Sequence, residues 1–110
     1  MKRRNVVVFE GAVVDIEEAR AFYDRQEGGL GDYFVSCLVS DLESLAFFAG
    51  IHSVWLGYHR MLSKRFPFAI YYDLVEDLAV VVAVLDMRRN PSTIAKRLSD
   101  PSRAVPSPAP

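Results

Sequence analysis

The sequence is short of the residues that build disulfide frameworks and zinc centres. Among its 110 residues there is one cysteine, Cys37, and there are two histidines, His52 and His59. A single thiol cannot form an internal disulfide, and the spacing of these side chains matches no metal-binding pattern. We therefore expect no metal and no cofactor, and a reducing, cytoplasmic location for the chain.

Long hydrophobic runs are also missing. The longest nearly uninterrupted one, Leu78–Leu85, is far shorter than the roughly 20 residues that a membrane span needs. After the basic N-terminus, the apolar run Val6–Phe9 is shorter than the about 7–15 residues of a secretory signal. We expect neither a signal peptide nor a membrane partner.

Charge of one sign is scarce as well. The formal net charge is -1, and a quarter of the residues are charged. The first fifty residues hold 5 basic against 9 acidic side chains, whereas the remainder holds 8 against 5. The chain is not expected to bind polyanions over its whole surface, although the second half could still present a basic patch.

The spacing of the apolar residues predicts alternating helical and extended segments. Extended segments are expected at Val6–Phe9, Ile51–Arg60, Arg65–Tyr72 and Leu78–Leu85, and helices from Ala12 to about residue 27, over Leu30–Ala49 and over Pro91–Leu98. Gly11 is expected to end the first strand, and residues 73–77 to form a turn. The order β-α-α-β-β-β, followed by a helix, indicates an α+β fold in which a helical hairpin covers a small, mostly antiparallel sheet.

One folded domain is expected over residues 1–99. Residues 100–110 contain four of the six prolines and few core-forming side chains, so we expect a proline-rich, disordered tail there.

The second face of the predicted sheet is too apolar to face water. Leu78–Leu85 offers apolar side chains to both faces, and Ala69 and Tyr71 add to the face away from the helical hairpin. Two arrangements would cover this face: another chain, or the C-terminal helix and tail folding back. The small size of the domain favours another chain.

A carboxylate interrupts the apolar stripe of the second helix. Asp41 lies seven residues after Phe34 on that stripe, and an unpaired buried carboxylate is costly. We expect Asp41 at the rim of the core, in contact with water, with Arg20 as a possible partner.

Several segments resemble one family. The order and length of the elements over about residues 6–98 are similar to those of the toxins of type II toxin–antitoxin systems in the ParE/RelE superfamily. The segments that carry this resemblance are Asp15–Ala19, Phe22–Tyr23, Gly29–Phe34, Arg65–Tyr72 and Val82–Pro91. Their Phe-Pro and Arg-Asn-Pro sequences resemble the ParE-like, or plasmid stabilization, branch more than the ribonuclease branch.

The resemblance implies a growth-arresting toxin that a cognate antitoxin neutralises. In the ParE branch the target is DNA gyrase, whose cleaved-DNA state is trapped, and in the RelE branch the toxin cuts mRNA at the ribosome. The oligomer would be a toxin–antitoxin complex or a homodimer. Four apolar residues are expected either to face the antitoxin or to belong to the core: Phe68, Ile70, Val80 and Val82.

The residues for RNA cleavage are incomplete. Arg65 and Arg88 lie where RelE-like enzymes place phosphate-binding arginines, and Arg89 and Arg97 could add to the same target-binding or phosphate-binding end. Cleavage also needs an acid and a base, and no His or Tyr follows the last strand. Asp86 would repel a phosphate. We therefore expect a non-enzymatic gyrase inhibitor, with a metal-independent endoribonuclease that uses Arg65 and Arg88 as the alternative.

Overall fold

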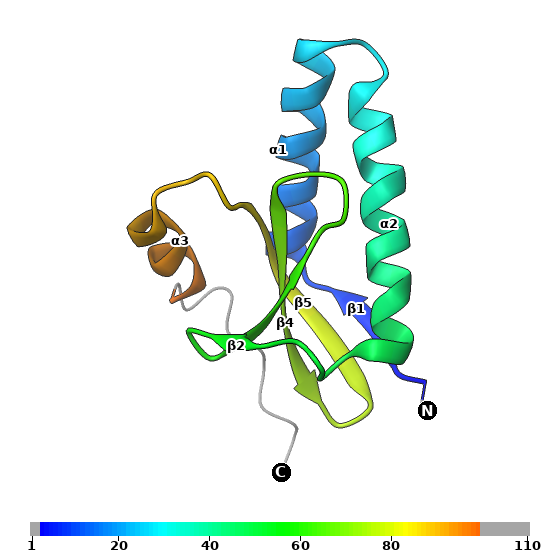
Figure 1. The fold of residues 1–110 in the computed structure, drawn as a ribbon, viewed down its shortest axis with the longest axis vertical. Helices are drawn as coiled ribbons and strands as arrows, with labels where there is room; N and C mark the ends of the chain where they lie inside the picture. The colour runs from blue at the N-terminus through cyan, green and yellow to red at the C-terminus, as the bar shows by residue number, and fades with distance from the viewer. Residues whose placement is uncertain (1–2, 100–110) are drawn as a thin grey trace.

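Five strands form one sheet in the computed structural model, which describes residues 3–99 of the chain (Figure 1). The strands are β1 (Asn5–Val8), β2 (Val54–Trp55), β3 (Tyr58–Leu62), β4 (Phe68–Val75) and β5 (Leu78–Asp86), and the helices are α1 (Glu10–Gln26), α2 (Leu30–Phe48) and α3 (Pro91–Leu98). The strand order is β1-β5-β4-β3-β2, and only the β1–β5 pair is parallel. The predicted α+β layout is confirmed, whereas the predicted tail lies outside the described residues.

Helices α1 and α2 form the predicted antiparallel hairpin over one face of the sheet (Figure 1). Their buried residues recur at helical spacing, as in Ala12, Ala19 and Tyr23 of α1, and they pack with Ile70 and Tyr72 of β4. Helix α1 begins at Glu10, so the expectation that Gly11 separates strand from helix was wrong: Gly11 lies inside the first turn.

Glycines set the close approach of the two helices. Gly29 precedes α2 with φ of 91°, a left-handed conformation that glycine adopts without strain. The Gly31 amide donates a hydrogen bond to Asp24 Oδ1 at 2.8 Å. A Cβ at Gly31 would collide with the backbone oxygen of Arg20, so the helix crossing requires glycine at this position.

Two predicted segments have different limits in the structure. The extended segment Ile51–Arg60 is divided by a tight turn into β2 and β3, because Leu56 and Gly57 both have positive φ, at 52° and 85°. Strand β4 continues to Val75, so the turn predicted over residues 73–77 was too long. As expected, Pro67 stays outside the sheet, immediately before β4.

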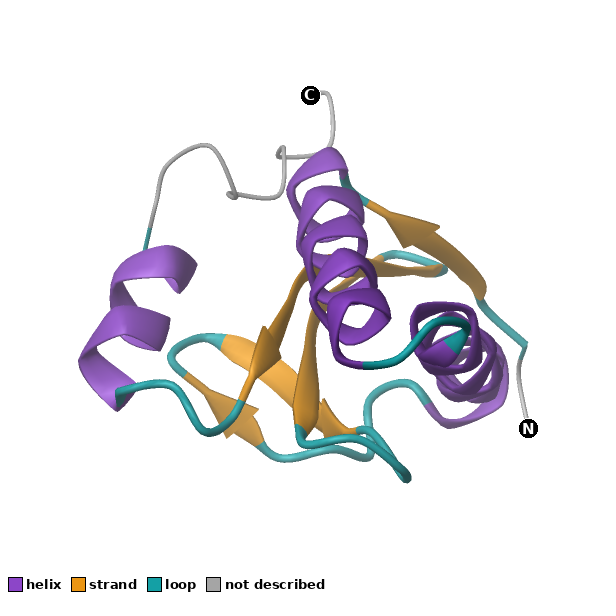
Figure 2. Ribbon diagram, turned by 90° about the horizontal axis from the view of Figure 1, so that it is seen from above, coloured by secondary structure: helices purple, strands orange, loops and turns teal. Residues whose placement is uncertain are grey.

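The second face of the sheet is covered by the chain itself, and the expectation of an open face was wrong. Ala69, Tyr71, Val80, Val82 and Leu85 are each at most 2% exposed. The side chains that cover this face belong to α3 and to the β2–β3 hairpin: Ile94, Leu98, Trp55 and Tyr58. Figure 2 shows α3 across the sheet from the α1–α2 hairpin. Four apolar residues were expected either to face the antitoxin or to belong to the core. All four are buried, so they are core residues: Phe68, Ile70, Val80 and Val82.

Strand β5 contains a β-bulge, and it forms the edge of the sheet beside α1 beyond the end of β1. Tyr71 pairs with Ala83 and Tyr72 pairs with Val81, which leaves Val82 as the extra residue. Strand β1 pairs only with Leu78–Val81. Over the rest of that edge, no strand among residues 3–99 pairs with β5, and helix α1 lies beside it.

Within residues 3–99, no helix combines the length and the apolar character that crossing a bilayer requires.

Candidate functional site

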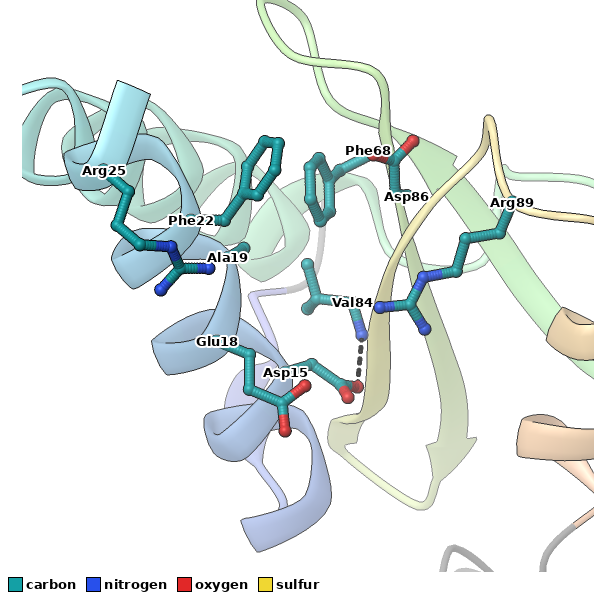
Figure 3. A pocket seen from close by; sticks show the side chains of 9 residues that line it. All are labelled: Asp15, Glu18, Ala19, Phe22, Arg25, Phe68, Val84, Asp86 and Arg89. Carbon is teal, nitrogen blue, oxygen red and sulfur yellow. Dashed lines mark hydrogen bonds between the residues drawn. The ribbon is translucent and has the colours of Figure 1, made fainter. Parts of the chain in front are cut away.

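A cavity of about 340 Å³ opens between α1 and the C-terminal half of β5. Its floor is apolar, with Ala19, Phe22, Phe68 and Val84, and its walls are charged (Figure 3). The charged residues are Asp15, Glu18 and Arg25 from α1, Asp86 at the end of β5, and Arg89 from the loop before α3. The segments after β1 and after β5 therefore meet at one site.

Asp15 connects three elements at the bottom of this cavity. Its Oδ2 accepts a hydrogen bond of 3.1 Å from the Val84 backbone N–H, on the part of the β5 edge that β1 does not reach (Figure 3). Its Oδ1 accepts a hydrogen bond from Arg97 Nη2 of α3. Burial raises the pKa of Asp15, whereas the Val84 amide and Arg97 act in the opposite direction. Asp15 thus joins α1, β5 and α3.

Arg88 is held by the carboxylate of Asp86. Its Nη2 lies 2.6 Å from Asp86 Oδ2, and its backbone N–H donates to Oδ1 at 2.8 Å. The hydrogen bonds from Arg88 lower the pKa of Asp86, so this carboxylate stays ionised at neutral pH. Asp86 thus offsets the charge of Arg88, and its expected repulsion of a phosphate stays a prediction.

The four predicted arginines differ in how they are held. Arg97 is paired with Asp15 and Arg88 with Asp86. Arg65 and Arg89 are exposed, and neither makes an ion pair within residues 3–99. The loops that carry Arg65 and Arg88 are adjacent, because the Met87 N–H donates to the Pro67 carbonyl oxygen at 2.8 Å. Arg89 lines the cavity between α1 and β5, whereas Arg65 lines a separate hollow beside α2.

The charges of the cavity nearly cancel. Asp15, Glu18 and Asp86 oppose Arg25 and Arg89 around the walls, and Arg97 is bound to Asp15. A phosphodiester site requires cations that are available to the phosphate. The arrangement is suited to a partner that carries charges of both signs, such as a protein surface.

The two histidines lie beside Tyr72 of β4, with His59 in β3 and His52 in the loop before β2. Tyr72 accepts a hydrogen bond of 2.9 Å from the Gly50 amide, and its hydroxyl is hydrogen-bonded to His52 Nδ1. His59 stacks on the Tyr72 ring and is hydrogen-bonded to the His52 carbonyl oxygen. Tyr72 is four residues from Phe68 along β4, about 13 Å. Neither histidine is therefore placed to act as acid or base beside Arg88.

Tyr23 carries an aromatic hydroxyl that lies close enough to Arg88 to feel its charge. It is 8% exposed, and burial raises its pKa, while the charge of Arg88 lowers it. A phenol whose pKa is raised stays protonated at neutral pH and is a poor base.

Sequence reasoning missed Asp15, although a signal was present. Asp15 lies three residues after Ala12 and four before Ala19, so it shares their buried face. An acidic residue early in a helix also suits the positive end of the helix dipole, so its position alone does not indicate a buried ion pair.

Asp41 also differs from expectation. It is 5% exposed, and its Oδ2 accepts a hydrogen bond of 2.7 Å from Ser63 Oγ. Arg20 pairs with Asp32 instead. The partner of Asp41 is thus a hydroxyl from the loop between β3 and β4, and not Arg20.

The fold is similar to that of a chain in a solved structure described as the chromosomal ParDE TA system from P. aeruginosa. The two chains superpose with a TM-score of 0.68 and 16% sequence identity, over 74% of this chain and 94% of the other. No protein-family model and no curated protein sequence matches this chain. The fold is thus shared with a chain of a toxin–antitoxin structure, as the sequence resemblance implied.

Proposed function

We propose that this chain is a ParE-like toxin of a type II toxin–antitoxin system, which inhibits DNA gyrase by binding and is neutralised by a cognate antitoxin. The fold shared with the ParDE structure carries the proposal, since it extends over 94% of that chain. The toxin would act in the cytoplasm, where gyrase works.

The chemistry of the cavity supports a binding role. Arg88 forms an ion pair with Asp86, and Arg97 forms one with Asp15. Two of the four arginines that could bind a phosphate are therefore already paired. Arg65 and Arg89 are exposed and carry charges that a target protein could contact. We assign these two residues to the target-binding surface, with the paired arginines shaping it.

Expression without antitoxin tests this role. The chain is induced in a bacterial host, and the incorporation of labelled thymidine and of labelled methionine is followed separately. We expect DNA synthesis to stop first and protein synthesis to decline later. Immediate loss of protein synthesis, with DNA synthesis intact, would exclude gyrase as the primary target.

Arginine variants locate the contact surface. Replacing both Arg65 and Arg89 by Ala should weaken growth arrest without unfolding the chain, because neither side chain makes an ion pair within the described part of the chain. Lys96→Ala removes an exposed cation from α3 and serves as the matched control. Equal toxicity of the double variant and the control would refute the assignment of Arg65 and Arg89.

A RelE-like endoribonuclease is the second candidate. One observation favours it: the Arg65 and Arg88 segments are adjacent through the Met87–Pro67 hydrogen bond. In this case mRNA would be cut soon after induction, and Arg65→Ala and Arg88→Ala would each abolish toxicity. Intact mRNA in growth-arrested cells would eliminate this candidate.

A further inference from the structure

Asp41 is a buried carboxylate on a face of α2 that is otherwise apolar. It lies three residues after Leu38 and four before Leu45, and both leucines belong to the core. A carboxylate loses its hydration when it is buried, whereas an apolar side chain of the same shape would gain by burial. Packing alone therefore does not account for an aspartate at this position.

The partner of Asp41 stands at the start of the β3–β4 loop, residues 63–67. The Ser63 hydroxyl donates a hydrogen bond of 2.7 Å to Asp41 Oδ2, and this bond joins the loop to α2. The Ser63 backbone N–H donates to the Phe68 carbonyl oxygen at 2.9 Å and closes the loop at its base. The first residue of the loop is thus held by its side chain and by its backbone.

The other half of the loop is anchored by Phe66. The centre of its ring lies 4.9 Å from that of Tyr23 and 5.1 Å from that of Phe34. These rings belong to the two helices of the hairpin, so the loop is fastened to α1 and α2 at this point as well. Lys64 and Arg65 lie between the two anchors.

Lys64 and Arg65 are exposed, and neither makes an ion pair within residues 3–99. Both line a hollow of about 220 Å³ against α2. Asp41 also lines this hollow, but one of its oxygens is occupied by the Ser63 hydroxyl. Cations on an anchored backbone lose less conformational entropy when they bind than cations on a mobile loop. The loop is therefore suited to contact an acidic patch of another protein.

We propose that Asp41 and Ser63 are positioning residues for the target-binding surface. Their hydrogen bond holds the β3–β4 loop in the conformation in which Lys64 and Arg65 contact an acidic patch of the target protein. Lys64 thereby joins Arg65 as a contact residue, whereas Asp41 and Ser63 act without touching the target. This inference rests on the proposed function and extends it to three further residues.

Replacing both partners of the hydrogen bond separates loop position from stability. In the double variant Asp41→Leu with Ser63→Ala, neither polar group remains, and leucine has the branching of aspartate. The urea midpoint should stay at or above that of the wild type, because an apolar pair of similar shape replaces a buried polar pair. Ser63→Ala alone leaves the carboxylate without this donor and should lower the midpoint. Ser63→Thr keeps the hydroxyl and is the conservative control.

Amide hydrogen exchange of the purified full-length chain, followed by NMR, measures the order of the loop. In the double variant the protection factor of the residue 63 amide should fall about tenfold, because the loop has lost its bond to α2. The Gly31 amide, which donates to Asp24 at the helical hairpin, should keep its wild-type protection. Unchanged protection at residue 63 in the folded double variant would overturn the positioning role.

Growth arrest after induction gives the functional result. The double variant should need about tenfold more protein than the wild type for the same arrest, and Ser63→Thr should match the wild type. Full arrest by a stable double variant would overturn the inference and leave the proposed function intact. A wild-type chain that does not arrest growth would overturn both.

Lys64 variants test the charge of the contact. Lys64→Ala should weaken growth arrest, whereas Lys64→Arg keeps the positive charge and should retain it. Lys96→Ala on α3 is again the control for loss of an exposed cation. Equal arrest by Lys64→Ala and Lys96→Ala would refute the assignment of Lys64 as a contact residue.

Discussion

Arg97 in the last helix donates a hydrogen bond to Asp15 in the first, across the edge of β5 that β1 leaves unpaired. The Asp15 carboxylate also accepts the Val84 backbone N–H on that edge. One buried side chain therefore fixes the position of α3, and α3 in turn covers the second face of the sheet.

Asp15→Ala should destabilise the chain strongly. The change leaves the Val84 amide and the partly buried Arg97 guanidinium without this partner, which should cost about 2–3 kcal/mol in the free energy of unfolding. Urea titration followed by circular dichroism measures it. Glu18→Ala, three residues on and exposed, should change stability by less than about 0.5 kcal/mol. Similar midpoints for the two variants would contradict a structural role for Asp15.

Ile94→Ala tests whether α3 covers the sheet in solution. Ile94 is 4% exposed and packs with Tyr71, Val80 and Val82, so its truncation should cost about 2–4 kcal/mol. Thr93→Ala, at the neighbouring exposed position, is the control. If α3 did not pack on the sheet, the two variants would unfold at the same urea concentration.

Gly31→Ala and Gly28→Ala form a matched pair at the helical hairpin. A Cβ at Gly31 meets the Arg20 carbonyl oxygen and the Asp24 carboxylate, and we expect a loss of about 1–3 kcal/mol. A Cβ at Gly28 meets no heavy atom within 4 Å, so this variant should be neutral or slightly stabilising. Thermal unfolding of both proteins measures the difference, and equal melting temperatures would show that the helices do not approach as closely as described.

His52 should make stability depend on pH below neutrality. Burial, aided by the charge of His59, lowers the pKa of His52 below its usual 6.5. The Tyr72 hydroxyl accepts from the Gly50 amide, so its own proton is directed to His52 Nδ1, which must be unprotonated to accept it.

The unfolded chain therefore takes up the His52 proton at a higher pH than the folded chain. The stability contribution is fully present above pH 6.5 and is lost as the pH falls through the lower pKa of the folded state. Urea titrations at pH 7.5 and pH 5.5 should show this loss, and His52→Gln should reduce it. An identical pH dependence in the two proteins would exclude His52 as its source.

The sequence was sufficient for the order of the elements, apart from the division of Ile51–Arg60 into β2 and β3, because their signals are local. The helical spacing in α1 and α2, and the cap of α3, where the Asn90 side chain accepts from the Ser92 amide at 2.9 Å, follow from neighbouring residues. The alternation of Phe68, Ile70 and Tyr72 likewise identified the face of β4 that packs on the helices.

Contacts between distant residues were the part that the sequence could not specify. Asp15 and Arg97 are 82 positions apart, and Asp41 and Ser63 are 22 apart, so no local pattern joins them. The open-face prediction failed for the same reason: the domain looked too small to cover both faces, but the eight-residue helix α3 and Trp55 and Tyr58 of the β2–β3 hairpin together cover the second face. The sequence accordingly predicted a set of arginines, but not the ion pairs that Arg88 forms with Asp86 and Arg97 forms with Asp15.

A gyrase cleavage assay tests the proposed function most directly. Purified chain is incubated with gyrase, ATP and plasmid DNA, and the products are separated after detergent and protease treatment. The proposed function predicts cleaved linear DNA that increases with the concentration of the chain and decreases in the Arg65 and Arg89 double variant. Supercoiling at the uninhibited rate, with no cleaved DNA at any concentration of folded chain, would contradict it.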